Sequence, residues 1–368
     1  MVWNANLRKL AKVLVQYSTK VETGDDVAIM GSDLAAPLVR EVYREVLIAG
    51  GHPSALCKPA DLDYIFYQNA SEEQLDHKPP VFKHIAENFD AVIRLAGEPN
   101  TKALSGVDSQ KIAYRQHATE EVMATFMERA AEEKLNWVLA QFPTHSCAQD
   151  AEMSLTGFQE FYLKACKLNS KDPVSEWEKM QQVQETIVDS LEDVSKIHIL
   201  SQDTDLRMST EGRKWISCAG LKNYPDGEVF TGPVEDSAEG HIRFNFPGIY
   251  CGKEIQDIRL TFENGEVKEA TAGKGQDLLE DLIETDEGAS KLGELGVGTN
   301  NGIQRFTKNM LFDEKMGGTI HLALGRGYPE SGSKNESGIH WDLLCDMKNE
   351  GKIYGDEELI YEDGKFKI

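Results

Sequence analysis

The sequence predicts an α/β N-terminal domain with an open, mainly parallel sheet, followed by an α+β C-terminal domain with a mixed, largely antiparallel sheet. Two observations divide the chain in this way. In the first half, short apolar runs alternate with longer amphipathic segments, the pattern of strand–helix–strand units. Later, the apolar runs become short and tight turns separate them, which favours antiparallel pairing. We therefore expect domains at residues 1–190 and 191–368.

The first half begins with an amphipathic helix predicted over Leu7–Gln16, whose apolar residues share one face. The run DVAIMGS (26–32) predicts a buried strand. Asp33 is placed to cap a helix that ends at Gly50, and HPSALCK (52–58) predicts the next strand. This strand–helix–strand unit indicates parallel pairing.

Two further strands are predicted in this half at DAVIRLAG and NWVLAQFP, with helices near 120–134 and 149–167. A long polar helix over 173–193 is the predicted connector, with Asp172 as its cap and Pro173 at its first position. The half contains no GxGxxG or Walker pattern, so no nucleotide site is predicted.

The second half has shorter elements. KIHIL predicts its opening strand, and DLLEDLIET predicts a helix. IRLTFENGEVKEATA predicts a hairpin, because Asn264-Gly265 between two alternating runs is the strongest short-range signal for a two-residue turn.

Composition and charge limit the classes of partner. The net charge is −23 and no Lys/Arg cluster is present, which argues against nucleic acid. The longest apolar runs are too short to span a bilayer, and the N-terminus lacks the pattern of a secretory signal. The six cysteines are scattered without a CxxC motif, which fits buried thiols in a reducing cytoplasm and argues against a thiolate zinc site.

Histidines and carboxylates gather between Gly293 and Asp342. GTIHLAL predicts a strand in which His321 projects between the small residues Thr319 and Ala323. In IHWD, His340 and Asp342 share a face if the segment is extended. Imidazoles and carboxylates together suit zinc, cobalt or manganese better than calcium.

Further carboxylates belong to this candidate site. Glu294 lies among glycines in GELGVG, and Glu314 lies in DEK. Glu228 follows the turn Pro-Asp-Gly at a strand start, a good ligand platform, although the residues alone favour an exposed turn glutamate there. Each alone is more often a turn, surface or helix-end residue, as is a lone strand histidine. Together they favour a metal site, because burying so many ionisable groups is costly unless a cation neutralises them. Glu235 has weaker support and is left out.

A nucleophilic hydrolase is not indicated. The chain has no GxSxG motif, and its only close cysteine–histidine pair, His145 and Cys147, is interpreted as coincidence. A metal-activated water is the mechanism that the remaining residues favour.

The segments YPDGEVFTGPVEDSAEG, GELGVGTN, DEKMGGTIHLALGRGYP and NESGIHWD resemble, in order, the metal-binding segments of the M29 metallopeptidases, the aminopeptidase T and aminopeptidase S family. The resemblance runs from about Tyr224 to Asp342. It implies a dimeric, two-metal exopeptidase that removes N-terminal residues from peptides with a free N-terminus.

The resemblance also implies roles for residues of this chain. Glu228, Glu294, His321, His340 and Asp342 match the family's ligand positions, for two zinc, cobalt or manganese ions. Glu294 is the expected bridging carboxylate. Glu314 is either a sixth ligand or the general base, and Tyr328 either donates a hydrogen bond to the oxyanion or only packs in its turn.

Other functions stay open at this point. The same ligands would serve a metallohydrolase of another substrate class, such as an amidase or a phosphoesterase. A non-catalytic protein that binds metal or peptide is the third reading, which the presence of all six candidate ligands argues against.

Overall fold

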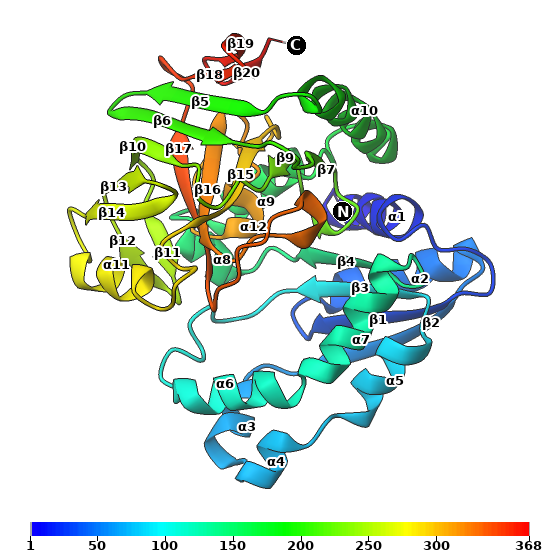
Figure 1. The fold of residues 1–368 in the computed structure, drawn as a ribbon. Coiled ribbons are helices and arrows are strands. Elements are labelled where there is room, and N and C mark those ends of the chain that lie inside the picture. The colour runs from blue at the N-terminus through cyan, green and yellow to red at the C-terminus, as the bar shows by residue number, and fades with distance from the viewer. Residues whose placement is uncertain (1, 368) are drawn as a thin grey trace. The chain divides into compact units, whose positions relative to one another are not determined.

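The structure is a computed structural model that describes residues 2–367 (Figure 1). These residues form two compact units. One holds the chain up to Glu176 together with Gly220–Pro225, and the other holds Trp177–Ala219 and the chain from Asp226 onward. The predicted domain boundary at residue 190 stays a prediction. No helix among residues 2–367 is long and apolar enough to cross a membrane.

A parallel sheet forms the centre of the first unit. Its strand order is β2-β1-β3-β4-β8, and each neighbouring pair runs parallel, as predicted. The apolar runs of the sequence supply the strands, which are β1 (Asp26–Ser32), β2 (His52–Lys58), β3 (Ala91–Ala96), β4 (Asn136–Gln141) and β8 (Asn223–Tyr224).

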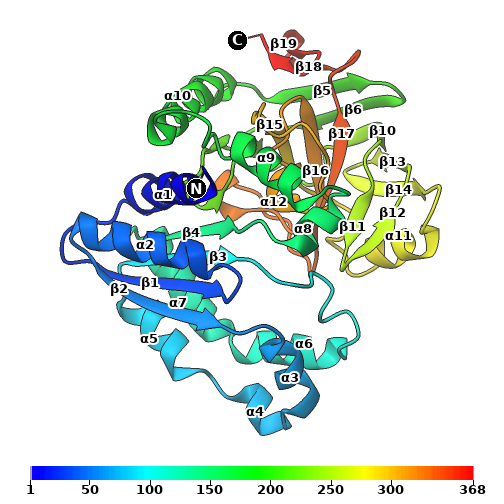
Figure 2. The ribbon, with the colours of Figure 1, turned by 180° about the vertical axis from the view of Figure 1, so that it is seen from behind.

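Helices cover both faces of this sheet, with α1 and α2 on one face and α5 and α7 on the other (Figures 1 and 2). This arrangement explains why the central strands are apolar on both sides. The helical segments are α1 (Val2–Lys12), the π-helix η1 (Val13–Ser18), α2 (Ala36–Ala49), α3 (Leu62–Asn69), α4 (Glu72–Asp76), α5 (Pro80–Asn88), α6 (Ser109–Ala118), α7 (Glu120–Ala131), α8 (His145–Asp150), α9 (Leu155–Ala165) and α10 (Pro173–Leu191).

The sequence predicted both the start and the end of helix α2. The helix ends at Gly50, whose φ of 90° is the left-handed conformation that glycine adopts readily. The predicted cap at Asp33 is wrong. Its carboxylate accepts a hydrogen bond from the neighbouring Leu34 amide, and the helix begins only after Ala35.

The second unit is built on two large antiparallel sheets. The larger has the order β14-β13-β10-β6-β5-β18-β19-β20, and the site sheet has the order β17-β16-β15-β9-β7. The strands of the larger sheet are β5 (Lys196–Ser201), β6 (Thr204–Ser209), β10 (Glu239–Phe244), β13 (Ile258–Glu263), β14 (Glu266–Thr271), β18 (Lys352–Gly355), β19 (Glu358–Glu362) and β20 (Lys365–Phe366). Those of the site sheet are β7 (Ile216–Cys218), β9 (Glu228–Thr231), β15 (Leu292–Gly298), β16 (Thr319–Gly325) and β17 (His340–Asp346).

The remaining elements of this unit are short. They are the pair β11 (Gly248–Tyr250) and β12 (Lys253–Ile255), the helices α11 (Gln276–Ile283) and α12 (Met310–Asp313), and the 3₁₀ turn η2 (Pro329–Ser331). The predicted hairpin is confirmed in β13 and β14, where Asn264 and Gly265 have φ values of 52° and 79°. The predicted fold class, α/β followed by largely antiparallel α+β, is confirmed.

One hydrophobic core lies between the two sheets of the second unit. It includes Ile199 and Leu206 from the larger sheet, and Leu295 and Leu322 from the site sheet. Because side chains alternate along a strand, the other face of the site sheet carries the neighbouring residues Glu294 and His321. The polar residues of these strands are therefore gathered on one face.

Candidate metal centre

Four neighbouring strands place the predicted ligands on the same face of the site sheet. On β16, Ile320, Leu322 and Leu324 enter the core, so His321 and Ala323 face the other way, as predicted. Side chains alternate in the same way on β9, β15 and β17. The side chains on the face of His321 are therefore Glu228, Glu294, His340 and Asp342. The structure thus brings together residues that lie more than a hundred positions apart.

Small residues make room for these side chains. Gly296 lies directly opposite His321 in the strand register. A Cβ atom at Gly296 would lie 2.0 Å from Cε1 of His321, so only glycine leaves space for the imidazole. Ala323 lies between Glu294 and Asp342 on the adjacent strands, where a larger side chain would separate the two carboxylates.

The first donor group consists of Glu228, Glu294 and His321. Nε2 of His321 lies 3.2 Å from Oε1 of Glu294 and 3.4 Å from Oε2 of Glu228. All three side chains are buried, and His321 is only 1% exposed. An imidazole nitrogen and two carboxylates converging at these distances can hold one divalent cation.

The second donor group consists of Glu294, His340 and Asp342. Nε2 of His340 lies 3.4 Å from Oε2 of Glu294 and 3.5 Å from Oδ1 of Asp342. The other ring nitrogen, Nδ1, donates a hydrogen bond to the carbonyl of Arg326 at 2.6 Å. That bond fixes the tautomer, so Nε2 is the nitrogen that faces the carboxylates.

Glu294 belongs to both groups and directs a different carboxylate oxygen toward each histidine. Within the described chain, Oε2 of Glu228 and Oδ1 of Asp342 are buried and accept no hydrogen bond. Buried carboxylate oxygens that accept no hydrogen bond are unfavourable, and a bound cation would remove that cost. The donor set therefore fits a divalent metal.

The electrostatics of the two groups are coupled. Burial lowers the pKa of His321, but Glu294 and Glu228 outweigh it and raise that pKa to about 9. Burial likewise opposes protonation of His340, yet Asp342 and Glu294 raise its pKa to about 10. Burial raises the pKa of Glu294. Without a metal, protonated imidazoles balance the negative charge of the carboxylates. A bound cation would displace the imidazole protons from the ligand nitrogens.

Glu314 lies beside the two donor groups rather than within either. Burial, opposed by Lys315, raises the pKa of Glu314 to about 8. Its Oε1 is 2.7 Å from Nζ of Lys315. Adjacent charges such as those of DEK are typical of a solvated helix end, but Lys315 is 2% exposed and forms its ion pairs in the interior.

Two residues of the site were missed from sequence. Asp226 belongs to the turn Pro-Asp-Gly and Lys315 to the run DEK, and neither was among the predicted site residues. Asp226 is buried, and its Oδ1 is 3.7 Å from Nζ of Lys315. The local signal for Asp226 was its position two residues before the strand EVFT, and turn aspartates share it.

Tyr328 lies next to the second donor group. Its ring centroid is 4.9 Å from that of His340 and 5.5 Å from that of Phe230. Partial removal from water and the carboxylates of Glu294 and Asp342 raise the pKa of its phenol, which therefore stays protonated. Tyr328 is still 42% exposed, so it forms an edge of the site that a ligand can reach.

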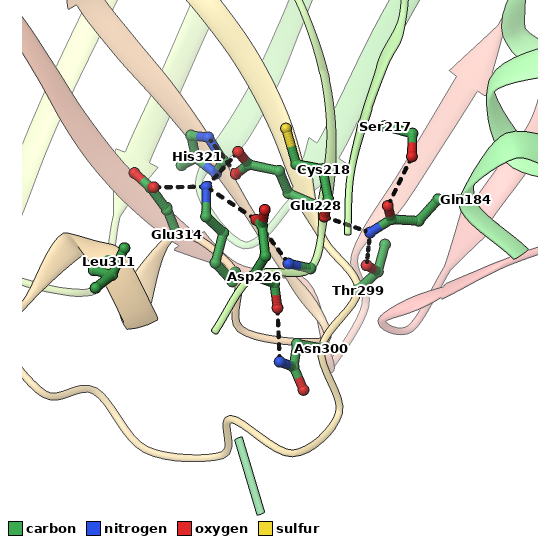
Figure 3. A network of polar contacts seen from close by, with 12 residues as sticks. Gln184, Ser217, Cys218, Asp226, Glu228, Thr299, Asn300, Leu311, Glu314 and His321 are labelled. Carbon is green, nitrogen blue, oxygen red and sulfur yellow. Dashed lines mark hydrogen bonds and ion pairs between the residues drawn. The ribbon is translucent and has the colours of Figure 1, made fainter. Parts of the chain in front are cut away.

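Two hydrogen-bond networks support the ligand strands. Gln184 of α10 donates to the carbonyl of Cys218 at 3.1 Å and to Oγ1 of Thr299 at 2.9 Å (Figure 3). On the other side, Oδ1 of Asp286 accepts from the amides of Gly288 and Ala289, while its Oδ2 accepts from Ser337 and Gly338. The second network joins the segments that lead into β15 and β17.

A family model described as "Thermophilic metalloprotease (M29)" matches residues 3–366. The chain belongs to this family. It is therefore a peptide hydrolase of a metalloprotease family, and the resemblance found in the sequence is confirmed.

Relatives in the M29 family match the chain over nearly its whole length. Aminopeptidase 2 of Geobacillus stearothermophilus is 26% identical, with 99% of this chain and 98% of the relative covered. Aminopeptidase T of Thermus thermophilus is 28% identical, with 98% and 95% covered.

Solved structures show the same fold. Wild-type AmpT from Thermus thermophilus aligns with a TM-score of 0.84 at 25% identity, over 99% of each chain. The 2,5-dihydroxypyridine dioxygenase of Pseudomonas putida aligns with a TM-score of 0.63 at 17% identity, over 99% of this chain and 97% of that one. The second likeness concerns the fold alone, so the chemistry must be argued from the site.

Proposed function

We propose that this M29 metalloprotease is an aminopeptidase that removes N-terminal residues from peptides with the help of two divalent cations. The observation that supports two ions is that Glu294 is shared by two donor groups, each with its own histidine and second carboxylate. The names of the relatives, aminopeptidase 2 and aminopeptidase T, support the substrate class.

In this proposal, Glu228 and His321 would hold one ion, His340 and Asp342 would hold the other, and Glu294 would be a ligand shared by both. When bound, such a pair of ions activates a water and polarises the scissile carbonyl. The imidazoles and carboxylates fix where that chemistry occurs, because the strands and the Arg326 carbonyl restrict their orientation. Zinc, cobalt and manganese each suit this mixture of nitrogen and oxygen donors.

Glu314 is the proposed general base. It takes a proton from the attacking water and returns it to the leaving amine. Its place outside both donor groups and its ion pair with Lys315 support this role over that of a sixth ligand. Tyr328 is the proposed donor to the oxyanion, because its phenol keeps its proton and lies beside His340.

Chelation tests the metal requirement. EDTA treatment followed by gel filtration should abolish hydrolysis of aminoacyl-p-nitroanilides, and added zinc, cobalt or manganese should restore it. Elemental analysis should then give two ions per chain. Full activity in a chain shown to be free of metal would exclude the proposal.

Substrate panels test the class of reaction. We expect cleavage of peptides with a free α-amino group and little cleavage of their N-acetylated forms. Preferential hydrolysis of simple amides or phosphate esters would instead assign an amidase or phosphoesterase to the same ligands.

We further propose that the chain acts as a homodimer in the cytoplasm. The free state of all six cysteines fits a reducing compartment. Light scattering at micromolar concentration should give twice the 41.1 kDa mass of the chain, and the mass of a monomer would contradict the dimer.

A further inference from the structure

Lys315 places a positive charge of the protein itself inside the site. Its Nζ hydrogen-bonds to Oε1 of Glu228, and lies 2.7 Å from Oε1 of Glu314 and 3.7 Å from Oδ1 of Asp226. Figure 3 shows these three carboxylates, two from the segment that leads into β9 and one from the end of α12, converging on one region. The lysine side chain is 2% exposed, so water does not screen these contacts.

Lys315 contacts only one of the two carboxylate oxygens of Glu228. Oε1 accepts the hydrogen bond from the ammonium group. Oε2 is buried without a hydrogen-bond donor among the described residues, and it lies 3.4 Å from Nε2 of His321. Only one oxygen of Glu228 is therefore free for a cation in the first donor group.

The ammonium also contacts a third set of possible metal ligands. Donor atoms of Cys218, Asp226 and Glu228 lie within 4.8 Å of one another, and Lys315 contacts both carboxylates of this set. A thiolate with two carboxylates would suit zinc or cobalt. A divalent ion there would lie against a buried ammonium, and like charges at such distances repel strongly in the interior.

We propose that Lys315 is a built-in cation that excludes metal from the Cys218–Asp226–Glu228 set and so confines divalent ions to the two groups that share Glu294. This inference rests on the proposed function, which assigns the two ions to the groups that share Glu294. It makes Lys315 a positioning residue, which acts on the ions through Glu228 and not by contact with the substrate.

Cobalt is a suitable probe, because a thiolate ligand gives cobalt(II) a charge-transfer band in the near ultraviolet that imidazole and carboxylate ligands do not give. The demetallated full chain is titrated with cobalt and followed by absorbance and elemental analysis. We expect the unaltered chain to take up its ions without a thiolate band.

The Lys315→Met variant should bind one more cobalt ion per chain and show the band, because methionine fills the space without the charge. The double variant Lys315→Met/Cys218→Ser should lose both the extra ion and the band. The inference is overturned if Lys315→Met adds neither, or if the unaltered chain already shows a band that Cys218→Ser removes.

Two comparisons keep the test decisive. Lys352→Met removes the ammonium of a half-exposed ion pair, 3.7 Å from Glu362, and should change neither cobalt content nor spectrum. If circular dichroism shows that Lys315→Met does not fold, Lys315→Gln removes the charge while keeping a hydrogen-bond donor, and the same outcomes apply.

Failure of the proposed function would look different. An unaltered chain that binds no cobalt would contradict the two-ion centre. A Cys218-dependent band gained only on loss of the Lys315 charge would still support exclusion by the ammonium.

Discussion

The hairpin β13–β14 of the larger sheet and the strand pair β15–β16 of the site sheet are both antiparallel, but their polar side chains have opposite environments. Along β13, buried and accessible positions alternate, and its polar side chains reach solvent. Along β15 and β16, every position is buried, including Glu294 and His321. In the hairpin, water satisfies a polar side chain. In the site strands, only another protein group or a cation can do so.

The same chemical change should therefore have very different effects in the two regions. The largest is expected for Glu294→Gln, because it removes a charge from both donor groups at once. Metal content should fall together with turnover, and kcat should fall by more than the roughly 10⁴-fold upper range of a lost general base. Elemental analysis and steady-state kinetics measure both. Two ions per chain with full kcat would place the site elsewhere.

A smaller effect is expected for Glu314→Gln. As the proposed base, Glu314 is needed for proton transfer but not for holding an ion. The variant should keep its metal and its KM while kcat falls by roughly 10²–10⁴-fold. Loss of metal to the extent seen with Glu294→Gln would instead make Glu314 a ligand.

Gly296→Ala tests how closely the strands fit around His321. The added Cβ would lie 2.0 Å from Cε1 of His321, so the imidazole must move. A displacement of about 1 Å costs on the order of 10²-fold in rate, and metal affinity in a competition assay should weaken with it. Gly273→Ala is the matched control, since its Cβ would lie 3.4 Å from the nearest atom, an ordinary contact. Equal metal affinity in the two variants would argue against this fit.

Glu269→Gln, on the accessible side of β14, should have the smallest effect. The change in the free energy of unfolding should stay within about 0.5 kcal/mol, measured by urea denaturation, with kcat unchanged. A loss of activity comparable with that of Glu294→Gln would remove the distinction between the two regions.

Strand positions were the most predictable part of the structure. Apolar runs bounded by turn residues predicted β1, β2, β3, β4 and β16 because local composition decides where such strands form. Alternation within GTIHLAL also predicted that His321 lies opposite the core-facing leucines, since this follows from the geometry of one strand.

The partners of the site residues were less predictable. Glu314 and Lys315 are adjacent in sequence, and adjacent charges usually lie on a solvated surface. Their burial depends on Asp226 and Glu228, which lie far away in the chain and reach them only through the order of the strands. Glu235, left out of the candidate ligands, forms an ion pair with Arg213 at 2.6 Å, outside the donor groups. Pairings of this kind are properties of the assembled sheet.

Asp286 reduces the conformational entropy that the ligand segments would lose on binding a metal. Its two carboxylate oxygens join the segments that precede β15 and β17, the strands that carry Glu294, His340 and Asp342. The conformational freedom of these segments is thus lost when the chain folds and not when an ion arrives. An arriving ion meets ligands whose backbones are already ordered, so its binding free energy goes mainly into dehydration and coordination.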